Sequence, residues 1–576
     1  MIDLEERRCD VLVVGTGAAG CLAAIEAADN DAEVVLTSKG ALGRTGTTNV
    51  ATVEMAAAIG HGDEEDSPWS HFTDTVIGSR YLANQELAHI LCFDSPSMVY
   101  YLDSLGMPWD KLPDGRYWQR PMPGMSYRRG VCYDAKTGKM LQGVLAHAVQ
   151  QRPTIHVLND FLVFRLLKST DGQIAGVVGW QSAVGRLLLI RARTVILATG
   201  GAGRLYKICG MDTGATGDGM AMAYFAGAEL QDMEFHQIFP TGFVWPECIK
   251  GMGVASSVLW SKGLRLYNAL GDRFMERYDP ARLENVPRDQ LTWAIHSEIR
   301  EGRGTEHGGV WLDTHAVENW QAVKTEFAKA YARPQSLGID TRRMEVGPYY
   351  HYTMGGIRFS VDGETTILGL FAAGEAGGGL HGANRLGGNA LSECAVFGVR
   401  AGRAAARRKG TLPDIDPAEK SEAVEYFYRV LDRKGPGRLP RDIRTDLAEM
   451  MNKYVWVLRA ADGLSRALES LGELRSEANV ATVTPEPRHH PSLFDALELD
   501  LMLVLAEPIV RSALLRTESR GSHQREDFPQ ADDEKWLCNI VVWRNAHGDA
   551  QHRLDPVRFT HCTPPALEKS SAWVTP

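Results

Sequence analysis

A glycine turn between an apolar strand and a helix limits the possible folds of this 576-residue chain more than any other feature. The apolar run Cys9–Val14 leads into Gly15-Thr16-Gly17-Ala18-Ala19-Gly20 and then into the alanine-rich segment Cys21–Ala28. Glu33–Leu36 is a second strand, so the pattern predicts a compact βαβ unit. In G-x-G-x-x-G the glycines make the turn, admit a pyrophosphate and let helix and strand pack closely. We therefore predict that a dinucleotide binds here, with its phosphates at the helix N-terminus.

The acidic residue that binds an NAD ribose at the end of the second strand is missing, and Thr37-Ser38-Lys39 stands in its place. A serine hydroxyl can still hydrogen-bond a ribose, but the pattern departs from that of plain NAD sites. Two later apolar strands also end in glycines, at Thr194–Gly201 and Gly369–Gly374. Because a larger nucleotide could run past all of these turns, we predict FAD and not NAD.

Composition and charge exclude several classes of protein. The net charge is −10 and no basic run occurs, which argues against nucleic acid as a partner. The nine cysteines include no C-x-x-C pair, so we expect no disulfide scaffold, no metal site and no intrinsic iron–sulfur cluster. The uncharged apolar stretch Val11–Ile25 is shorter than the roughly 20 residues that a membrane span needs. The polar segment Met1–Asp10 does not resemble a secretory signal, and we expect a cytoplasmic protein.

The C-terminal part of the chain is predicted to be helical. Ala418–Leu431 and Ser492–Arg520 are the clearest helical segments, and Gly521 is placed to cap the second. After Trp536 we expect a short irregular tail. A group of charged residues near this end is expected to tie the helical region to the rest of the chain: Arg516, Glu518, Arg520, Arg525 and Asp527.

Nine segments match one family of flavoproteins, in order along the chain. They are GTGAAG (15–20), SKG (38–40), LATGGAGRLY (197–206), TGDGMAMA (216–223), DMEFHQIFPTG (232–242), EGRG (301–304), HYTMGGI (351–357), AAGEAGGGLHGANRLGGNAL (372–391) and ESRGSHQREDFP (518–529). On these motifs the chain resembles the succinate dehydrogenase/fumarate reductase flavoprotein family, which also includes L-aspartate oxidase. The resemblance implies an α/β fold with a Rossmann-like FAD-binding domain, an inserted α+β capping domain and a helical C-terminal domain. We expect the FAD-binding domain over 1–234 and 351–412, the capping domain over 235–350, the helical domain over 413–535 and the tail over 536–576.

The resemblance also implies which residues contact FAD. They are Gly15, Gly17, Ala18, Ala19, Gly20, Ser38, Lys39, Gly46, Thr47, Thr199, Gly200, Gly201, Asp218, Glu375, Ala390 and Leu391. In the family, the segment that attaches the flavin covalently usually reads Arg-Ser-His-Thr, whereas this chain has Arg44-Thr45-Gly46-Thr47. Since the histidine is absent, we expect FAD to be bound non-covalently.

The reaction of the family moves a hydride between the flavin N5 atom and a carbon next to a carboxylate. By resemblance, His351 and Arg385 bind that carboxylate, and Arg303 donates a proton in the reductase direction. An arginine fork and a histidine donor are also a natural clamp for a carboxylate in a dry site. From spacing alone, His351 could equally be a core histidine and Arg385 part of a structural ion pair. For Arg303 only the resemblance indicates catalysis, because a guanidinium with a pKa above about 12 is a poor acid.

The expected far end of the substrate site departs from the family. Its Phe-His-Pro-Thr-Gly is Ile238-Phe239-Pro240-Thr241-Gly242 here, so Phe239 replaces the histidine that would hold a second carboxylate. The family segment Thr-Glu-x-x-Arg aligns with Ser256-Ser257-x-x-Trp260, which removes the glutamate and arginine of the proton relay. His236 lies close by on an extended segment and is expected to point to the opposite face.

These changes predict a small carboxylate substrate with one carboxylate and an apolar or aromatic far end, in place of fumarate or succinate. Leaving one charge of a buried pair unmatched costs roughly 3–5 kcal/mol, or about two to four powers of ten in rate. Alternatively, Gln237 or Arg265 binds the second carboxylate, and the chain is a succinate dehydrogenase or fumarate reductase subunit with a rebuilt site. A third interpretation is a non-catalytic FAD electron-relay subunit.

Electrons have to come from a partner, because the chain carries no cluster ligands of its own. The resemblance suggests a separate iron–sulfur or other electron-transfer subunit, and dioxygen or a small reductant are the alternatives. Without the relay glutamate, the proton donor would be resupplied by water, by Ser257 or by a group that the sequence does not identify.

Overall fold

The largest sheet brings three glycine-containing turns to one edge. The computed structural model describes residues 4–564 except 52–53, 123, 135, 255–259, 261, 327 and 485–489. Six strands of the sheet follow the order β6-β2-β1-β9-β8-β7, and β16 pairs with β9. They are β1 Leu4–Val14, β2 Val34–Thr37, β6 Ile155–Leu158, β7 Phe161–Lys168, β8 Ile174–Gln181, β9 Arg186–Leu197 and β16 Leu370–Ala372. Because β1, β9 and β16 are parallel, the turns at Gly15, Gly200 and Gly374 follow strand ends at the same edge.

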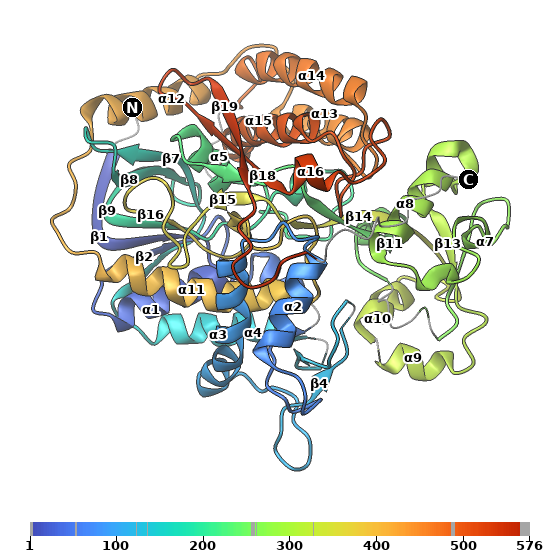
Figure 1. The fold of residues 1–576 in the computed structure, drawn as a ribbon. Coiled ribbons are helices and arrows are strands. Elements are labelled where there is room, and N and C mark those ends of the chain that lie inside the picture. Colours follow the sequence, from blue (N-terminus) through green and yellow to red (C-terminus); the bar gives the residue numbers. More distant parts are fainter. Residues whose placement is uncertain are drawn as a thin grey trace.

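Helices pack closely beneath this sheet (Figure 1). They include α1 Ala18–Asp29, α2 Pro68–Gly78, α3 Gln85–Ser104, α4 Thr137–Gln150 and α11 Asn389–Arg407. Two glycines of α11 allow the contact with α1, since a Cβ on Gly398 would lie 2.7 Å from the Ala19 oxygen. A Cβ on Gly402 would lie 2.3 Å from the Ala23 oxygen. Helix α11 is thereby held against the helix that starts at the first glycine turn.

A second unit stands beside the main body and is joined to it through β11 and β14 (Figure 1). Its antiparallel sheet has the order β11-β14-β13-β12. The unit contains β11 His236–Phe243, β12 Arg265–Tyr267, β13 Val310–Asp313, β14 Arg343–Thr353, α7 Met275–Tyr278, α8 Arg288–Glu298, α9 Trp320–Glu326 and α10 Ala328–Ser336. It has its own hydrophobic core, in which Trp260, Phe274 and Leu291 are buried.

The C-terminal helices pack above the large sheet (Figure 1). They are α12 Pro417–Leu431, α13 Pro440–Tyr454, α14 Ala461–Asn479, α15 Pro491–Leu515 and the short α16 Asp533–Trp536, while α5 Asp218–Phe225 lies between α15 and the sheet. The predicted α/β fold, with its FAD-type sheet, inserted α+β unit and helical C-terminal region, is confirmed. Among the described residues, no helix has the length and apolarity needed to cross a bilayer.

The end of α15 differs from the prediction. The helix stops at Leu515, so both the extension to Arg520 and the cap at Gly521 are wrong. The guanidinium of Arg525 instead donates to the carbonyl oxygens of Ala513 at 3.0 Å and Arg516 at 2.9 Å, which satisfies the free carbonyls of the last turn. Gly521 has a φ of +55° in a later turn, where a Cβ would lie 2.3 Å from the Ala383 oxygen.

The expected irregular tail after Trp536 is also wrong. Strands β18 Cys538–Arg544 and β19 Ala550–Pro556 form an antiparallel hairpin. β18 extends a sheet with the order β17-β15-β10-β18-β19, in which β10 is Leu230–Gln231, β15 is Gly356–Arg358 and β17 is Gly377–Gly378. The apolar run at 538–543 is a strand signal that the prediction missed.

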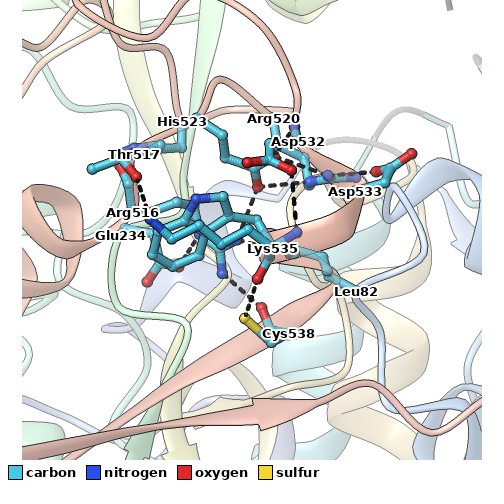
Figure 2. A network of polar contacts seen from close by, with 12 residues as sticks. Leu82, Glu234, Arg516, Thr517, Arg520, His523, Asp532, Asp533, Lys535 and Cys538 are labelled. Atoms are coloured by element: carbon cyan, nitrogen blue, oxygen red, sulfur yellow. Dashed lines mark hydrogen bonds and ion pairs between the residues drawn. The ribbon is translucent and has the colours of Figure 1, made fainter. Parts of the chain in front are cut away.

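The predicted tie between the C-terminal region and the rest of the chain is confirmed (Figure 2). Arg516 is fully buried and donates from Nε to Glu234 at 2.7 Å and from Nη1 to Glu518 at 2.9 Å. Its Nη2 reaches the Cys538 carbonyl oxygen at 2.8 Å. Arg520 binds both oxygens of Glu518, at 2.8 and 2.9 Å. Arg516 therefore joins the end of α15 to the segment before β11 and to the first residue of β18.

Candidate functional site

The first glycine turn has the geometry of a phosphate site. Gly15 has a φ of +113°, and a Cβ there would lie 2.2 Å from the Ala198 carbonyl oxygen. Gly17 is the N-cap of α1, whose first turn holds no acidic residue and has no side-chain cap. A Cβ on Gly46 would lie 3.7 Å from the Gly17 Cα, so the segment that includes Gly46 and Thr47 lies against the turn. The backbone N–H of Ala18 donates to the Thr48 hydroxyl at 3.0 Å, and the glycines leave the rest of the helix N-terminus open to an anion.

Ser38 and Lys39, which follow the second strand, each contact residues from other segments of the predicted FAD site. Ser38 accepts a hydrogen bond from Thr16 at 2.9 Å between the two hydroxyl oxygens. The Lys39 ammonium lies 3.3 Å from Asp218 and 2.7 Å from Glu498. Burial raises the pKa of Asp218, and the nearby Lys39 ammonium works against that shift.

A third group of predicted contacts surrounds Gly200, which has a φ of +75°. No described protein atom lies within 4 Å of where a Cβ would stand on this residue. A Cβ on Gly201, in contrast, would lie 2.3 Å from Oε1 of Glu375. Glu375 accepts a hydrogen bond from the Thr353 backbone N–H at 2.9 Å, and burial raises its pKa to about 8. In the part of the chain that the structure describes, Thr199 Oγ1 and Asp218 Oδ1 are buried without a hydrogen-bond partner.

These features fit a bound FAD. The carboxyl ends of the parallel strands bring together three features of a nucleotide site. They are backbone without side-chain cover, hydroxyl and carboxylate oxygens without hydrogen-bond partners, and the open space beside Gly200. Ala390 and Leu391 lie in the first turn of α11, which begins after Gly388 without a side-chain cap. Their backbone N–H groups belong to the first turn, where helices leave donors unpaired.

A cluster of cations and aromatic rings lies at the junction with the second unit. The Phe239 ring of β11 and the His351 ring of β14 have centroids 4.6 Å apart. Burial lowers the pKa of His351 well below its usual value, and the charges of Arg385 and Arg288 lower it further. The imidazole is therefore neutral at physiological pH and can serve as a hydrogen-bond donor or acceptor.

Arg385 is nearly fully buried, and one of its three guanidinium nitrogens has no hydrogen-bond partner among the described residues. Its Nη2 donates to Oε1 of Gln237 at 2.7 Å, and its Nη1 donates to the Leu386 carbonyl oxygen at 2.9 Å. Its guanidinium carbon lies 4.6 Å from the centroid of the Tyr352 ring. Among the described residues, its Nε has no partner. Burial lowers the pKa of this guanidinium, because removal from water disfavours the charged form, and a bound anion would favour it.

Arg288 belongs to the same cluster and was missed in the sequence. Its guanidinium carbon lies 4.5 Å from the centroid of the Phe239 ring, and its Nε has no partner among the described residues. Burial, with the charge of Arg385 next, lowers its pKa to about 10. The sequence did contain a signal, because Arg288 is the first residue of α8, where the helix dipole disfavours a cation.

Arg303 is not brought to this cluster. Its Nε and Nη2 each donate to Glu298 at 2.8 Å, and Nη2 also donates to Glu301 at 2.5 Å. These two carboxylates raise the pKa of the guanidinium, which is the opposite of what a proton donor needs. The prediction of Arg303 as the proton donor is therefore corrected, because the residue forms a structural ion pair at the end of α8.

The remaining predicted pocket residues have different positions. Trp260 is 6% exposed and lies in the core of the second unit, so the structure gives it a packing role. Ser256 and Ser257 lie outside the described residues. His236 faces away from Phe239, as predicted, since its Nδ1 lies 2.7 Å from the hydroxyl of Tyr350.

Two family models match the chain. One, described as FAD binding domain, covers residues 10–391, and the other, described as fumarate reductase flavoprotein C-term, covers residues 444–570. The chain is 38% identical over 546 residues to a fumarate reductase (CoM/CoB) subunit of Methanothermobacter marburgensis, with 94% of this chain and 98% of that protein covered. The chain belongs to the succinate dehydrogenase/fumarate reductase flavoprotein family. This flavoprotein binds FAD and is an oxidoreductase that acts on CH–CH or C=C bonds.

Solved structures resemble this flavoprotein over almost its whole length. A Mycobacterium smegmatis Sdh1 structure in complex with UQ1 has a TM-score of 0.90 at 34% identity and covers 96% of this chain and 95% of its own. An Escherichia coli quinol fumarate reductase structure has a TM-score of 0.89 at 31% identity, with 98% and 99% covered. The arrangement of the three parts of this flavoprotein is thus that of its relatives.

Proposed function

We propose that this flavoprotein reduces, or forms, a carbon–carbon double bond next to the carboxylate of a substrate whose far end is apolar or aromatic. The observation that supports this function is the contact of Phe239 with His351 and Arg288 beside Arg385. The group offers cationic donors for one carboxylate and a phenyl ring where a second carboxylate would otherwise be held. An aromatic ring gives a far-end carboxylate no hydrogen bond, and the lost pairing costs roughly 3–5 kcal/mol.

The side chains of the cluster have different roles toward the substrate. Arg385, with its free Nε, and His351 bind the carboxylate and draw electron density from the neighbouring alkene. FAD, when bound, supplies the two-electron hydride chemistry. Arg288 protonates the α-carbon during reduction, and its pKa of about 10 makes it a stronger acid than an ordinary guanidinium. In the oxidative direction the same group accepts that proton.

A fumarate reductase or succinate dehydrogenase with a rebuilt dicarboxylate end is the second candidate, and it is favoured by the name of the 38% identical relative. Gln237 is a poor second carboxylate binder because Arg385 already uses its side-chain oxygen and its amide donates to the Arg385 carbonyl at 2.8 Å. Arg265 is exposed on β12. A non-catalytic electron relay would need neither the neutral His351 nor the two arginines.

Two further expectations belong to this proposal. Several relatives are named as subunits of a larger enzyme, so we expect a separate iron–sulfur or other electron-transfer subunit in the same cellular compartment, the cytoplasm. Gly46 occupies the family's attachment position, so we expect FAD to be released by denaturation in acid.

Reoxidation of the reduced flavin under anaerobic conditions tests the substrate class. The FAD-loaded protein is reduced with dithionite, and its visible absorbance is followed after addition of fumarate, crotonate or cinnamate. We expect the monocarboxylates, above all cinnamate, to restore the absorbance faster than fumarate. Faster reoxidation by fumarate would support the rebuilt dicarboxylate site, and no reoxidation by any acid would support the electron relay.

A further inference from the structure

Two residues that face each other across a pair of strands hold the side chain of Arg385. Gln237 of β11 is paired with Tyr352 of β14, and these two strands join the second unit to the main body (Figure 1). Nη2 of Arg385 donates to Oε1 of Gln237 at 2.7 Å, and the guanidinium carbon lies 4.6 Å from the centroid of the Tyr352 ring. Arg385 belongs to the loop before α11, so its position depends on strands that continue into the second unit.

The amide of Gln237 makes contacts on both of its sides. Besides the oxygen that accepts from the guanidinium, its Nε2 donates to the Arg385 carbonyl oxygen at 2.8 Å and to Oδ1 of Asn384 at 3.3 Å. Asn384 in turn donates to the carbonyl oxygen of Gly78, the last residue of α2, at 3.1 Å. Both Gln237 and Arg385 are buried. Only a group with an acceptor on one side and a donor on the other can make these contacts, and a carboxylate, which has acceptors alone, cannot.

A β-bulge lies next to this strand pair. The register shifts between the pairs Gln237–Tyr352 and Ile238–Tyr350, so His351 is the extra residue of β14. A bulge redirects the side chain of its extra residue, and bulges are common beside active sites. The strand pair that holds the arginine is therefore continuous with the bulge that directs the histidine of the expected carboxylate clamp.

The neutral partner leaves Arg385 its charge. A carboxylate beside a guanidinium cancels most of the local charge, as Glu298 does for Arg303, from which it accepts two hydrogen bonds. The amide oxygen of Gln237 satisfies the same kind of donor without a negative charge. A guanidinium has five N–H donors; Nη1 donates to the Leu386 carbonyl oxygen, and Nε, without a partner among the described residues, is left for an anion.

We propose that Gln237 is a positioning residue, which fixes the orientation of the Arg385 guanidinium and keeps its charge available for the carboxylate of the substrate. The inference rests on the function proposed above only in taking Arg385 as a carboxylate binder, and it holds for a monocarboxylate and a dicarboxylate alike. Gln237 acts through Arg385 and needs no contact with the substrate. Its replacement should therefore change how tightly an acid binds and how well it is oriented, with FAD still in place.

Gln237→Glu tests whether the neutral partner matters. The oxidised, FAD-loaded protein, which has no hydride to transfer, is titrated with cinnamate and with fumarate while the visible absorbance of the flavin is followed. We expect the Kd of the tighter-binding acid near pH 8 to rise roughly 10–100-fold, because the new carboxylate competes for the guanidinium. The ratio of this Kd to that of the wild type should fall as the pH is lowered, since a protonated carboxyl group again offers one acceptor and one donor.

Gln290→Glu is the matched control. Gln290 of α8 also accepts a hydrogen bond from an arginine, Nη2 of Arg282 at 3.2 Å, but neither residue belongs to the cluster around Arg385. The Kd of this variant should stay within about threefold of the wild type at each pH, because a new charge pair near the surface has a small effect.

Gln237→Met removes both polar contacts without adding a charge. We expect reoxidation of the reduced flavin by the same acid to slow roughly 10–100-fold per bound FAD, with the Kd changed less than about fivefold, because a displaced arginine misorients the acid. A purely structural role would instead lower the Tm and the FAD content and leave the rate per bound FAD unchanged.

Binding of the acid by Gln237→Glu within about threefold of the wild type near pH 8 would overturn the proposal, as would an unchanged rate per bound FAD in Gln237→Met. The proposed function fails separately. A wild type that prefers fumarate refutes the monocarboxylate substrate, and one that binds an acid without being reoxidised by it refutes the hydride transfer. In both cases Gln237→Glu still tests the positioning role, whereas a wild type that binds neither acid refutes both proposals.

Discussion

The guanidinium carbon of Arg288 lies 4.5 Å from the centroid of the Phe239 ring. Arg288 begins α8 and Phe239 lies on β11, so the capping unit supplies both residues. A cation over an aromatic face is attractive, so this contact helps to hold the guanidinium beside the ring. The two side chains together give the site a charged part and an apolar part, and this division underlies the predictions that follow.

Substitution of the two candidate donors distinguishes their roles. We expect Arg288→Lys to lower kcat by roughly 10²–10⁴-fold, the usual effect of losing a positioned acid. Arg303→Lys should keep kcat within about threefold and lower the Tm, because lysine cannot form the two-bond pair with Glu298. Steady-state kinetics and thermal unfolding of both variants measure this, and a larger kcat loss in Arg303→Lys would contradict the assignment.

Phe239→His should shift the substrate preference towards dicarboxylates. An imidazole at this position can donate to a far-end carboxylate, and a hydrogen bond to a charged group contributes about 1.5–3 kcal/mol. We expect the ratio of kcat/KM for fumarate to that for cinnamate to rise by roughly 10–100-fold. Phe239→Leu, which stays apolar, serves as the control and should leave the fumarate rate unchanged. An unchanged ratio in Phe239→His would argue that another group sets the specificity.

Two glycine substitutions separate folding from cofactor binding. Gly15→Ala places a Cβ 2.2 Å from the Ala198 carbonyl oxygen, so we expect little folded protein. Gly200→Ala meets no described protein atom within 4 Å and suffers only the strain of a positive φ, about 1–2 kcal/mol. It should fold and yet contain less FAD, as measured by the ratio of flavin to protein absorbance. Full FAD occupancy in Gly200→Ala would show that the cofactor passes elsewhere.

Asp232 makes the stability depend on pH. Burial, with repulsion from Glu234 next, raises the pKa of Asp232 to about 7, although Asn539 and Arg516 favour the charged form. Between the unfolded pKa near 3.9 and the folded pKa, the native state binds more protons than the unfolded state. The free energy of unfolding should therefore fall as the pH rises through this window. Asp232→Asn should flatten that fall in denaturant unfolding of the holoprotein, and an equally steep fall would exclude Asp232 as its source.

Local signals made the N-terminal part of the fold predictable. The first strand, its glycine turn and its helix are adjacent in sequence, and each carries its own pattern. The hairpin after Trp536 was missed although its first strand carries a local apolar run at 538–543, whereas the pairing of that strand with β10, about three hundred residues earlier, leaves no local pattern. The end of α15 was misplaced for a similar reason, since Arg525 replaces the glycine cap from a later loop.

The candidate site was predicted in part. The structure brings Phe239, His351 and Arg385 together, as the motifs indicated, and pairs Lys39 with Asp218. The role of proton donor was predicted for Arg303 and is now proposed for Arg288. Both arginines belong to α8 or to the segment at its end, and only the partners of each guanidinium distinguish them. A motif identifies a residue type, whereas the ionisation of that residue depends on neighbours that the fold assembles.

The pairing of β10 with β18 has a consequence for biosynthesis. β10 pairs with β15 on one side, and its neighbour on the other side is β18, residues 538–544. Until the ribosome has released that segment, one edge of β10 stays unpaired and open to other chains. A product that terminates before residue 538 therefore cannot complete this sheet, so the native fold forms only after β18 has been made.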